Sequence, residues 1–392
     1  MASDILTLNA GSSSLKFSRW RSTSTGLRDV LRGEVEKIGI APHLIAREPG
    51  GKIVLSRNFD EGGARLTHED LLHELFSWLS EQGHGELKAI GHRVVHGGSE
   101  FKAPVRVDDC VMQRLCKLQP LAPLHQPHNL SAIRACAALQ PQVPQVACFD
   151  TAFHQTMDIC ARRLGLPRSY EEEGVQRYGF HGLSYEFIAQ QLRAIDAALA
   201  NARVIVAHLG NGASLCAMRD GRSIDTTMSF TALDGLLMGT RPGTLDPGAV
   251  TYLMREHGMN ADKIEDVLYH RSGLLGVSGI SSDMRTLLAS NDPRAREAIE
   301  LFVFRAAREI GALMASLGGL DGLVFTAGIG EHAPEIRSRI CARCAWLGVV
   351  LDDDANVAGQ LQINRESSRI RVYVIPTDEE KMIALHTAQS ID

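Results

Sequence analysis

Small and hydroxyl-bearing residues gather at three places where an apolar stretch of the chain ends. They occupy residues 9–16, 208–212 and 325–331. Glycine lets backbone N–H groups approach an anion closely, and serine hydroxyls add further hydrogen-bond donors. One such turn is ordinary at the end of a strand, but three in one chain indicate loops that bind a polyphosphate and its nucleoside.

Two other kinds of nucleotide site have recognisable motifs. A Walker P-loop needs Gly-x-x-x-x-Gly-Lys followed by Ser or Thr, and the sequence contains no such run. Residues 328–333 do fit the dinucleotide pattern Gly-x-Gly-x-x-Gly/Ala, and acidic residues 352–354 follow about 20 positions later. That motif leaves the other two turns unexplained, so a hydride-transfer enzyme stays the less favoured alternative.

Three arginines stand beside turns. Arg93 lies at a strand edge before the pair Gly97-Gly98, Arg241 lies in the tight loop Gly239-Thr-Arg-Pro-Gly243, and Arg285 ends the run Ser281-Ser-Asp-Met-Arg285. A single arginine is most often a solvated surface residue. Packing does not readily explain an arginine between glycine and proline. Planar guanidinium groups can bridge the three oxygens of a transferring phosphoryl group. The loops therefore favour phosphoryl transfer.

Carboxylates and one histidine complete the candidate chemistry. Asp150 directly follows the apolar run 145–149, where an acid is either functional or the N-cap of the next helix. Glu379 and Glu380 follow another apolar run, and either is suited to hold Mg²⁺. His181 stands in the glycine-framed loop Tyr178-Gly-Phe-His-Gly. A buried structural histidine and a donor to a phosphoryl oxygen are about equally good interpretations of it.

These residues need a scaffold of mixed sheets and helices. Apolar periodicity predicts helices over 68–82 and 294–317, the second ended by Gly318-Gly319. Short apolar runs predict buried strands, at 89–90, 94–95, 145–149, 323–325 and 372–375. Hairpins combined with strand–helix units favour α/β domains.

The two halves of the chain resemble each other. Residues 4–20 and 203–219 both read as a strand, a small-residue turn and a departing strand. Aligning Ser14 with Ser214 places the copies about half a chain apart, which predicts a duplicated domain. We expect the active site in the cleft between the two domains.

Composition limits the class of protein. A chain of 392 residues with 44% hydrophobic and 22% charged residues predicts two globular domains. A net charge of -5 gives no reason to expect nucleic acid or an anionic membrane as a partner. The N-terminus has no signal-like segment, and no apolar run approaches the ~20 residues of a membrane span.

The eight cysteines are scattered, and only Cys341 and Cys344 lie close together. A zinc ribbon would require a second such pair. A redox dithiol is the weaker alternative to reduced cysteines in a cytoplasmic protein.

With these motifs the sequence resembles the acetate kinase (acetokinase) family. The resemblance covers nearly the whole chain and rests on motifs in family order. They are Asn9-Ala-Gly-Ser-Ser-Ser-Leu-Lys, His92-Arg-Val-Val-His-Gly-Gly, Phe149-Asp-Thr-Ala-Phe-His, Tyr178-Gly-Phe-His-Gly, His208-Leu-Gly-Asn-Gly, Gly239-Thr-Arg, Ser282-Asp-Met-Arg and Phe325-Thr-Ala-Gly-Ile-Gly-Glu.

The resemblance implies the fold of the acetate and sugar kinase, Hsp70 and actin superfamily. That fold has two ribonuclease-H-like, actin-like domains from an internal duplication. We expect them at 1–150 plus 380–392 and at 151–379. The implied activity is reversible transfer of the ATP γ-phosphoryl group to acetate, giving acetyl phosphate and ADP. The resemblance also implies a cytoplasmic homodimer that uses Mg²⁺, with Mn²⁺ as an alternative.

The resemblance assigns a role to each matching position. Asn9 and Glu379 would bind the metal. Ser12, Ser14 and Lys16 would meet the ATP phosphates. Arg93 and Arg241 would bind the carboxylate and the phosphoryl group. Asp150 would be the catalytic acid, and His181 would stabilise the transition state. The nucleotide would be lined by His208, Leu209, Gly210, Asn211, Gly212, Asp283, Met284, Arg285, Gly328, Ile329, Gly330, Glu331 and His332. The acyl pocket would be lined by Arg93, Val95, Leu124, Phe180 and Ala232.

The sequence departs from the family pattern at a few of these positions. The family usually has Asn at His332 and at Asp378, and often Pro at Ala232. It also often has Ser-Gly-Asp at 242–244. The change at Ala232 touches the expected acyl pocket, so propionate is expected as a second substrate, and a longer acid is an alternative.

A short carboxylic acid, with a pKa near ~4, is ionised at pH 7 and needs no strong general base. We therefore expect direct in-line transfer, with Asp150 orienting the metal, its waters or the substrate. An ATP-gated binding protein of the same superfamily is the non-enzymatic alternative. The arginines, Asp150 and His181 count against it.

Overall fold

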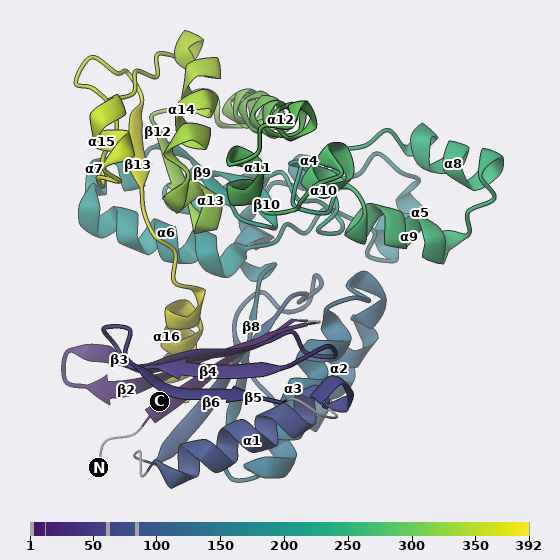
Figure 1. Ribbon diagram of the computed structural model, residues 1–392, viewed down its shortest axis with the longest axis vertical. Helices are drawn as coiled ribbons and strands as arrows, with labels where there is room; N and C mark the ends of the chain where they lie inside the picture. Colours follow the sequence, from purple (N-terminus) through teal and green to yellow (C-terminus); the bar gives the residue numbers. More distant parts are fainter. Residues whose placement is uncertain (1–3, 12, 60–62, 83–85, 392) are drawn as a thin grey trace. The chain divides into compact units, whose positions relative to one another are not determined.

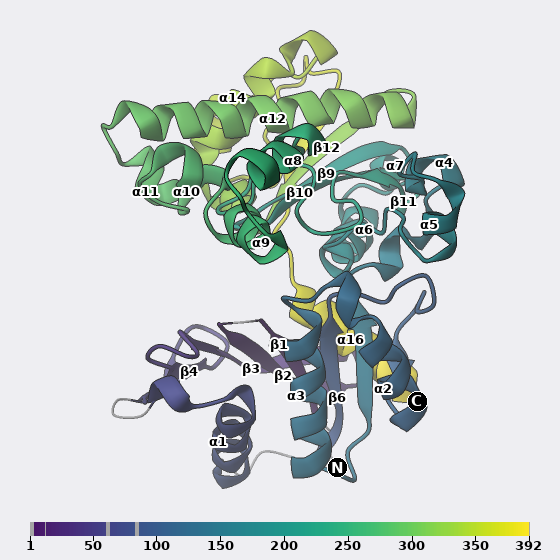
Figure 2. The same ribbon diagram turned by 90° about the vertical axis from the view of Figure 1, so that its right-hand side faces the viewer.

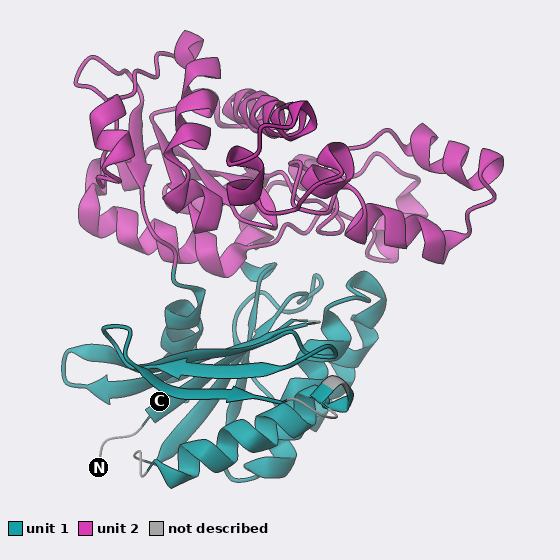
Figure 3. Cartoon of the chain, viewed as in Figure 1, with its two compact units in different colours: residues 1–152, 378–392 teal, residues 153–377 magenta. Residues whose placement is uncertain are grey.

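The computed structural model describes residues 4–11, 13–59, 63–82 and 86–391 (Figure 1). The chain divides into two compact units (Figure 3). Unit 1 comprises residues 1–152 and 378–392, and unit 2 comprises residues 153–377. The expected boundaries at 150 and 379 each lie two residues from these. Glu379, which was expected in the second domain, belongs to unit 1.

Unit 1 is built on an eight-stranded sheet in the order β5-β4-β3-β2-β1-β6-β8-β7. Strands β1 to β5 are antiparallel neighbours, and β1, β6 and β8 run parallel. The strands are β1 (Asp4–Ala10), β2 (Leu15–Thr23), β3 (Gly26–Glu36), β4 (His43–Arg47), β5 (Ile53–Asn58), β6 (Leu87–Val94), β7 (Val105–Arg106) and β8 (Gln145–Phe149).

Helices cover both faces of this sheet. They are α1 (His68–Glu81), α2 (Asp109–Lys117), α3 (Gln126–Leu139) and α16 (Glu379–Ile391). Side chains alternate between the two faces of a strand. Leu6 and Leu8 of β1 therefore join the core with α1 and α3, whereas Ile5 packs with Ala384 of α16. The last helix of the chain is thus part of the first unit (Figure 2).

Unit 2 is built on a five-stranded sheet in the order β11-β10-β9-β12-β13. The strands are β9 (Arg203–Leu209), β10 (Ala213–Arg219), β11 (Arg222–Thr226), β12 (Gly322–Thr326) and β13 (Arg371–Val374). Its longer helices are α6 (Gly182–Ile195), α8 (Pro247–Glu256), α9 (Ala261–His270), α12 (Pro293–Leu317) and α14 (Pro334–Arg343).

Short helices complete unit 2. They are α4 (Ile159–Arg162), α5 (Arg168–Glu172), α7 (Ala197–Ala200), α10 (Gly273–Ser278), α11 (Met284–Leu288), α13 (Ala327–His332) and α15 (Asp353–Val357). Figure 2 shows α12 running along the unit beside α10 and α11. Short 3₁₀ turns occur at Gly63–Arg65, Gln119–Leu121, Ala152–Thr156 and Ala345–Leu347.

The two sheets share one plan, which agrees with the duplication predicted from the sequence. In each, three antiparallel strands lead to two strands parallel to the first: β3-β2-β1-β6-β8 in unit 1 and β11-β10-β9-β12-β13 in unit 2. The predicted alignment of Ser14 with Ser214 does not match the strands. Strand β10 begins at Ala213, two residues earlier than that alignment implies. One reason is that the second turn is shorter: it spans residues 210–212, whereas the first spans 11–14.

Most predicted elements are present. The helix predicted over 68–82 ends one residue earlier, and its start is fixed by a capping box between Thr67 and Asp70. The helix predicted over 294–317 is α12, and Gly318 caps it in the left-handed conformation with φ of 70°. The two strands predicted at 89–90 and 94–95 are one strand, β6, because His92 is buried and paired within the sheet.

Candidate active site

Four side chains of unit 1 form a cluster that we call the charged cluster: Asn9, Arg93, Asp150 and Glu379. Arg93 is its centre. Its Nη2 and Nε donate to the Asp150 carboxylate at 2.6 and 3.0 Å, and its Nη1 donates to Asn9 Oδ1 at 3.1 Å. A Glu379 oxygen lies 3.9 Å from Arg93 Nε. The structure thus brings together the predicted metal ligands and two predicted catalytic residues.

The strand order of the sheet explains why the side chains of the charged cluster lie together. Asn9 stands near the end of β1, Arg93 near the end of β6, and Asp150 directly after β8. Parallel neighbours end at one edge of a sheet, which is where α/β proteins place their ligands. Glu379 reaches the same edge from the first turn of α16. A side chain at Gly91 would meet Thr387 Oγ1 at 2.1 Å, so glycine there lets α16 pack closely on β6.

Burial makes the electrostatics of this cluster strong. Asp150 has 1% of its side chain exposed, and Arg93 has 21%. Burial alone would lower the pKa of Arg93, but Asp150 and Glu379 together raise it. The pKa of Glu379 is raised to about 7, mainly by burial and further by the charges of Asp150 and Glu380, against the opposing positive charge of Arg93. The positive charge of one arginine therefore offsets only part of the negative charge of the neighbouring carboxylates.

The donor set suits a hard divalent cation. Asn9 and Glu379 offer an amide and a carboxylate oxygen, the ligands that Mg²⁺ takes from proteins. Among the described residues, no group of three or more His, Cys, Asp or Glu side chains is arranged to hold a metal. Mg²⁺ usually keeps water and phosphate as its remaining ligands, so two protein oxygens are chemically sufficient. The residues therefore fit a magnesium ion carried by a nucleotide.

Lys16 lies directly opposite Asn9 in the β1–β2 pair, which places both side chains on one face of the sheet. Lys16, Arg32 and Glu380 also line a pocket of about 240 Å³ in unit 1. Ser14 lies in the turn just before β2, and the backbone N–H of Gly11 donates to its carbonyl at 2.8 Å. Ser12 falls outside the described residues.

Two buried amides of α3 hold the loops of unit 1, and the sequence analysis did not single them out. Asn129 donates to the carbonyl of Ala10 at 2.7 Å and accepts from the backbone N–H of Val95 at 3.0 Å. Gln126 bonds both backbone groups of His96. The available signal was a pair of amides three residues apart on an apolar helix face.

Unit 2 holds a second cluster, which we call the histidine cluster: His181, His208 and Arg241. The two imidazole rings stack with centroids 4.1 Å apart. His181 Nδ1 lies 2.8 Å from Ser214 Oγ, and His208 Nδ1 lies 2.9 Å from Ser184 Oγ. Hydrogen bonds at Nδ1 orient the Nε2 side of each ring.

Gly212 shows how close the members of the histidine cluster are. A Cβ atom added to Gly212 would lie 2.7 Å from Arg241 Nη2 and 3.4 Å from His181 Nε2. The two predicted transition-state donors therefore flank one backbone position. Arg241 is further held by a 2.7 Å hydrogen bond from Nη1 to the carbonyl of Ala232.

His154 positions the segment that carries His181. Its Nε2 lies 2.9 Å from the carbonyl of Phe180, and its Nδ1 lies 2.8 Å from Ser223 Oγ. Complete burial lowers the pKa of His154 to about 4, so the ring is neutral at pH 7. His181 itself has φ of 59°, a left-handed conformation that is strained for a residue with a side chain.

A pocket of about 650 Å³ lies next to the histidine cluster within unit 2. It is lined by Gly210, Asn211, Ser282, Asp283, Met284, Arg285, Leu288, Gly328, Ile329, His332 and Ala333. Apolar side chains form its walls, and polar groups converge on it, as is typical of a site for a small molecule. Asp283 caps α11 and pairs with Arg285 at 2.7 Å.

The lining includes eight of the predicted nucleotide residues and leaves out five. The five are His208, Leu209, Gly212, Gly330 and Glu331. Leu209 is buried in β9. The Glu331 carboxylate instead accepts the backbone N–H groups of Ala327 at 2.8 Å and Thr377 at 3.1 Å. Sequence motifs mark a loop as a whole and do not reveal which side chains turn inward.

The predicted acyl-pocket residues belong to different units. Val95 and Leu124 lie in unit 1, and Phe180 and Ala232 lie in unit 2. Val95 and Phe180 are buried. The acyl pocket therefore stays a prediction.

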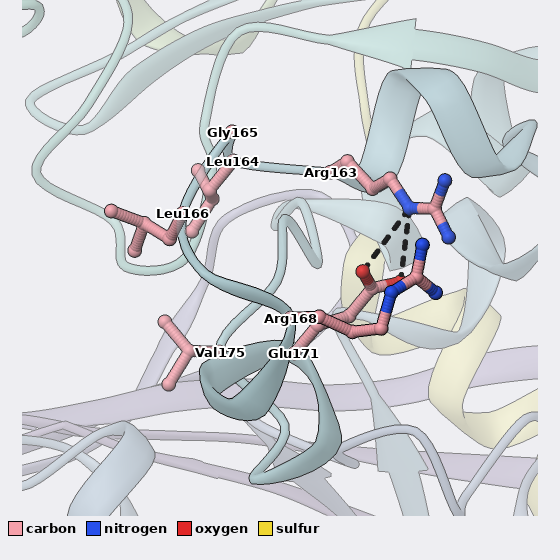
Figure 4. A pocket seen from close by; sticks show the side chains of 7 residues that line it. All are labelled: Arg163, Leu164, Gly165, Leu166, Arg168, Glu171 and Val175. Carbon is pink, nitrogen blue, oxygen red and sulfur yellow. Dashed lines mark hydrogen bonds and ion pairs between the residues drawn. The ribbon is translucent and has the colours of Figure 1, made fainter.

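A separate cavity of about 140 Å³ lies on the α4–α5 segment of unit 2 (Figure 4). Arg163 and Glu171 form an ion pair at its edge, and Leu164, Leu166 and Val175 form its apolar side. None of the sequence motifs falls on it.

The described cysteines form no disulfide. Burial raises the pKa of the Cys344 thiol to about 11, which opposes the reactivity of a redox dithiol with Cys341. No helix in the part of the chain that the structure covers is long and apolar enough to span a bilayer.

Comparisons with known proteins show which family the chain resembles. The acetokinase family profile matches residues 4–385. An acetate kinase from Rhodopseudomonas palustris is 53% identical over 398 residues, which cover 100% of this chain and 99% of that protein. An acetate kinase from Rhizobium meliloti is 49% identical, with 98% and 97% covered.

Solved structures give the same result. The acetate kinase of Porphyromonas gingivalis superposes with a TM-score of 0.88 at 36% identity, covering all of both chains. A propionate kinase from Francisella tularensis superposes with a TM-score of 0.92 at 38% identity, covering 99% of each. With this likeness along its whole length, the chain belongs to the acetokinase family.

Proposed function

We propose that this protein is a kinase that transfers the γ-phosphoryl group of ATP reversibly to acetate, giving acetyl phosphate and ADP. One observation carries the proposal. In unit 2 a single turn, residues 210–212, borders two features. Gly210 and Asn211 line the 650 Å³ pocket, and Gly212 lies against Arg241 and His181. A nucleoside in that pocket would direct its phosphates along the turn toward two donors of positive or partial positive charge.

The charged cluster supports a carboxylate as acceptor. The carboxylate is ionised at pH 7, so the reaction needs charge neutralisation and alignment more than proton removal. Asp150 is bound by Arg93 through two nitrogens and is almost fully buried. Such a carboxylate orients a cation or a neighbouring group, which agrees with a positioning function for Asp150.

The implied metal would be held by Asn9 and Glu379. When bound, a Mg²⁺ ion would supply positive charge that offsets the charge of the phosphates. Arg93 would hold the acetate carboxylate, and Lys16 would meet the ATP phosphates. Arg241 and His181 would donate to the oxygens of the transferring phosphoryl group. Preorganised donors of this kind stabilise a charged transition state without further reorganisation. Both clusters are needed for in-line transfer on this proposal.

Propionate is the second candidate substrate. A propionate kinase is among the structures that superpose well on this chain. Ala232, which is smaller than proline, is the predicted wall residue that would admit another methylene.

We also propose that the protein acts as a homodimer. Helix α8 has no buried residue in the isolated chain. It exposes Tyr252 at 58% and Met254 at 44%. A second copy would shield these apolar side chains from water. Light scattering after gel filtration would give twice the chain mass, and Tyr252→Glu would be expected to give the monomer.

The activity is tested by trapping acetyl phosphate as its hydroxamate. Purified protein with ATP, Mg²⁺ and acetate should form the hydroxamate, and omission of acetate should abolish it. Propionate and butyrate run in parallel rank the acids. ATP binding without any acyl phosphate from any of the three acids would favour a binding protein instead.

A further inference from the structure

Arg337 of α14 is a buried cation that no described carboxylate neutralises. It is among the largest completely buried side chains of the chain, with 1% exposed. Burial lowers the pKa of its guanidinium, yet arginine stays protonated in proteins at physiological pH. A buried charge without a counter-ion is costly, so strong hydrogen bonds must compensate for it.

Four hydrogen bonds from the guanidinium compensate for its charge, and their acceptors lie in two segments, α13 and α15. Nη1 donates to the carbonyls of Gly330 at 2.9 Å and Glu331 at 2.8 Å. Nε and Nη2 donate to the side-chain and backbone oxygens of Asn356 at 2.8 and 2.7 Å. Asn356 is buried and donates in turn to the carbonyl of Pro334 at 2.9 Å. Arg337 thereby joins α13, α14 and α15.

The carbonyls that Arg337 holds belong to the short helix α13, which we call the turn 327–332. Its residues Gly328, Ile329 and His332 line the pocket. This turn does not follow backbone preference. Ala327 has φ of 63°, the left-handed region that a residue with a side chain rarely adopts. Glu331 holds the start of the turn through the N–H of Ala327, and Arg337 holds its end. Two side chains that do not line the pocket therefore fix its shape.

We propose that Arg337 is a positioning residue for nucleotide binding, which holds the turn 327–332 in its binding shape with Asn356 as its anchor. This inference rests on the proposed function, because it takes the 650 Å³ pocket as the nucleotide site. Without Arg337 the turn would be in the competent shape only part of the time. The apparent Kd for nucleotide rises as the inverse of that competent fraction. Saturating nucleotide selects the competent shape again, so kcat is retained.

The test compares Arg337→Met with Arg339→Met. Arg339 lies on the same helix, is one-third exposed and pairs with Glu300 and Glu335, away from the turn. The Kd for ATP is measured by calorimetry. The kcat and the KM for acetate are measured in the activity assay at saturating ATP. Arg337→Met should raise the Kd about 10-fold if the competent fraction falls to about a tenth. Its kcat and acetate KM should match those of wild type, and Arg339→Met should change none of the three.

Amide hydrogen exchange provides a readout independent of activity. Residues 328–332 should exchange faster in Arg337→Met than in Arg339→Met without nucleotide, and equally once ATP is saturating. A purely structural arginine would speed exchange throughout α14 and α15 and lower kcat at saturating ATP as well.

A Kd for Arg337→Met equal to that of wild type would overturn the inference. If Arg337→Met does not fold, Asn356→Ala decides, because it keeps the arginine and removes one of its anchoring acceptors. An unchanged Kd in that variant would overturn the inference too. Failure of the proposed function looks different, since the wild-type protein itself would then bind no ATP.

Discussion

Equivalent positions of the two sheets carry different chemistry. In unit 1 the cross-strand pair near the end of the first hairpin is Asn9 and Lys16, and in unit 2 it is His208 and Ser214. The parallel strands of unit 1 supply Arg93, near the end of β6, and Asp150, directly after β8. The segments after the parallel strands of unit 2 supply the turn 327–332 and Thr377, whose backbone N–H donates to the Glu331 carboxylate.

A duplicated sheet thus determines where loops arise but not which chemical groups they carry. Unit 1 gathers carboxylates around Arg93, which partly balances their charge in a largely buried network. Unit 2 gathers two stacked imidazoles and Arg241 beside a pocket that the loops 210–211 and 328–333 help to line. On the proposed function this division suits a reaction between two anions, because the groups of unit 1 would hold a cation and the acceptor and those of unit 2 would hold the nucleotide.

Arg93→Ala should have the largest effect, because it removes the centre of the charged cluster. The buried Asp150 would lose its partner, which costs about 3–5 kcal/mol of unfolding free energy. Activity should fall as well, by about 10²-fold or more. Urea unfolding and kcat measure the two effects. The double variant with Asp150→Asn should regain stability but not activity; a single variant as stable as wild type would argue against a buried ion pair.

Arg241→Ala should lower kcat by about 10²–10³-fold, the typical loss on removing one transition-state donor. The Kd for ATP should change little, because Arg241 does not line the pocket. Arg285→Ala is the matched contrast, since Arg285 does line it: that variant should weaken ATP binding and keep kcat. A near-normal kcat for Arg241→Ala would remove Arg241 from the reaction.

The two turns can be compared by Gly212→Ala and Gly11→Ala. A methyl group at 212 would collide with Arg241 and crowd His181. A displacement of about 1 Å in such a site can cost about 10²-fold in rate. A methyl group at Gly11 would lie 3.4 Å from its nearest neighbour, Ser14 Oγ, which is an ordinary contact. The kcat of Gly11→Ala should therefore stay within about two-fold of wild type. Equal losses in both variants would mean that the turns act alike.

Ala232→Pro should have the smallest effect, confined to substrate choice. Filling one methylene of space in an apolar pocket is worth about 1–3 kcal/mol. The ratio of kcat/KM for propionate to that for acetate should therefore fall in the variant. An unchanged ratio would show that Ala232 does not line the acyl site, and that its carbonyl, which binds Arg241, is its only contribution.

Local sequence signals predicted the scaffold well. The strand Gln145–Phe149 and both hairpins follow from apolar runs and small-residue turns, because neighbouring residues decide these features. The charged cluster required more. Glu379 meets Arg93 only because α16 packs against β6 at Gly91, a contact between residues nearly 300 positions apart in the chain.

The supporting residues were the least predictable. Asn129, His154 and Arg337 act through backbone carbonyls and N–H groups of distant loops. A sequence shows the type of such a residue and the element that carries it, but not which backbone group it will reach. For the same reason, the sequence did not reveal that the Glu331 side chain binds backbone N–H groups instead of lining the pocket.

The discontinuity of unit 1 has a consequence for biosynthesis. Its charged cluster needs Glu379, and one face of its sheet needs α16, yet more than 220 residues separate these from Ala152. While the ribosome is still translating unit 2, Ile5 and the α16-facing side of β6 have no helix to cover them. Unit 1 therefore cannot complete its core before synthesis of the whole of unit 2, and translation itself sets the order in which the side chains of the charged cluster assemble.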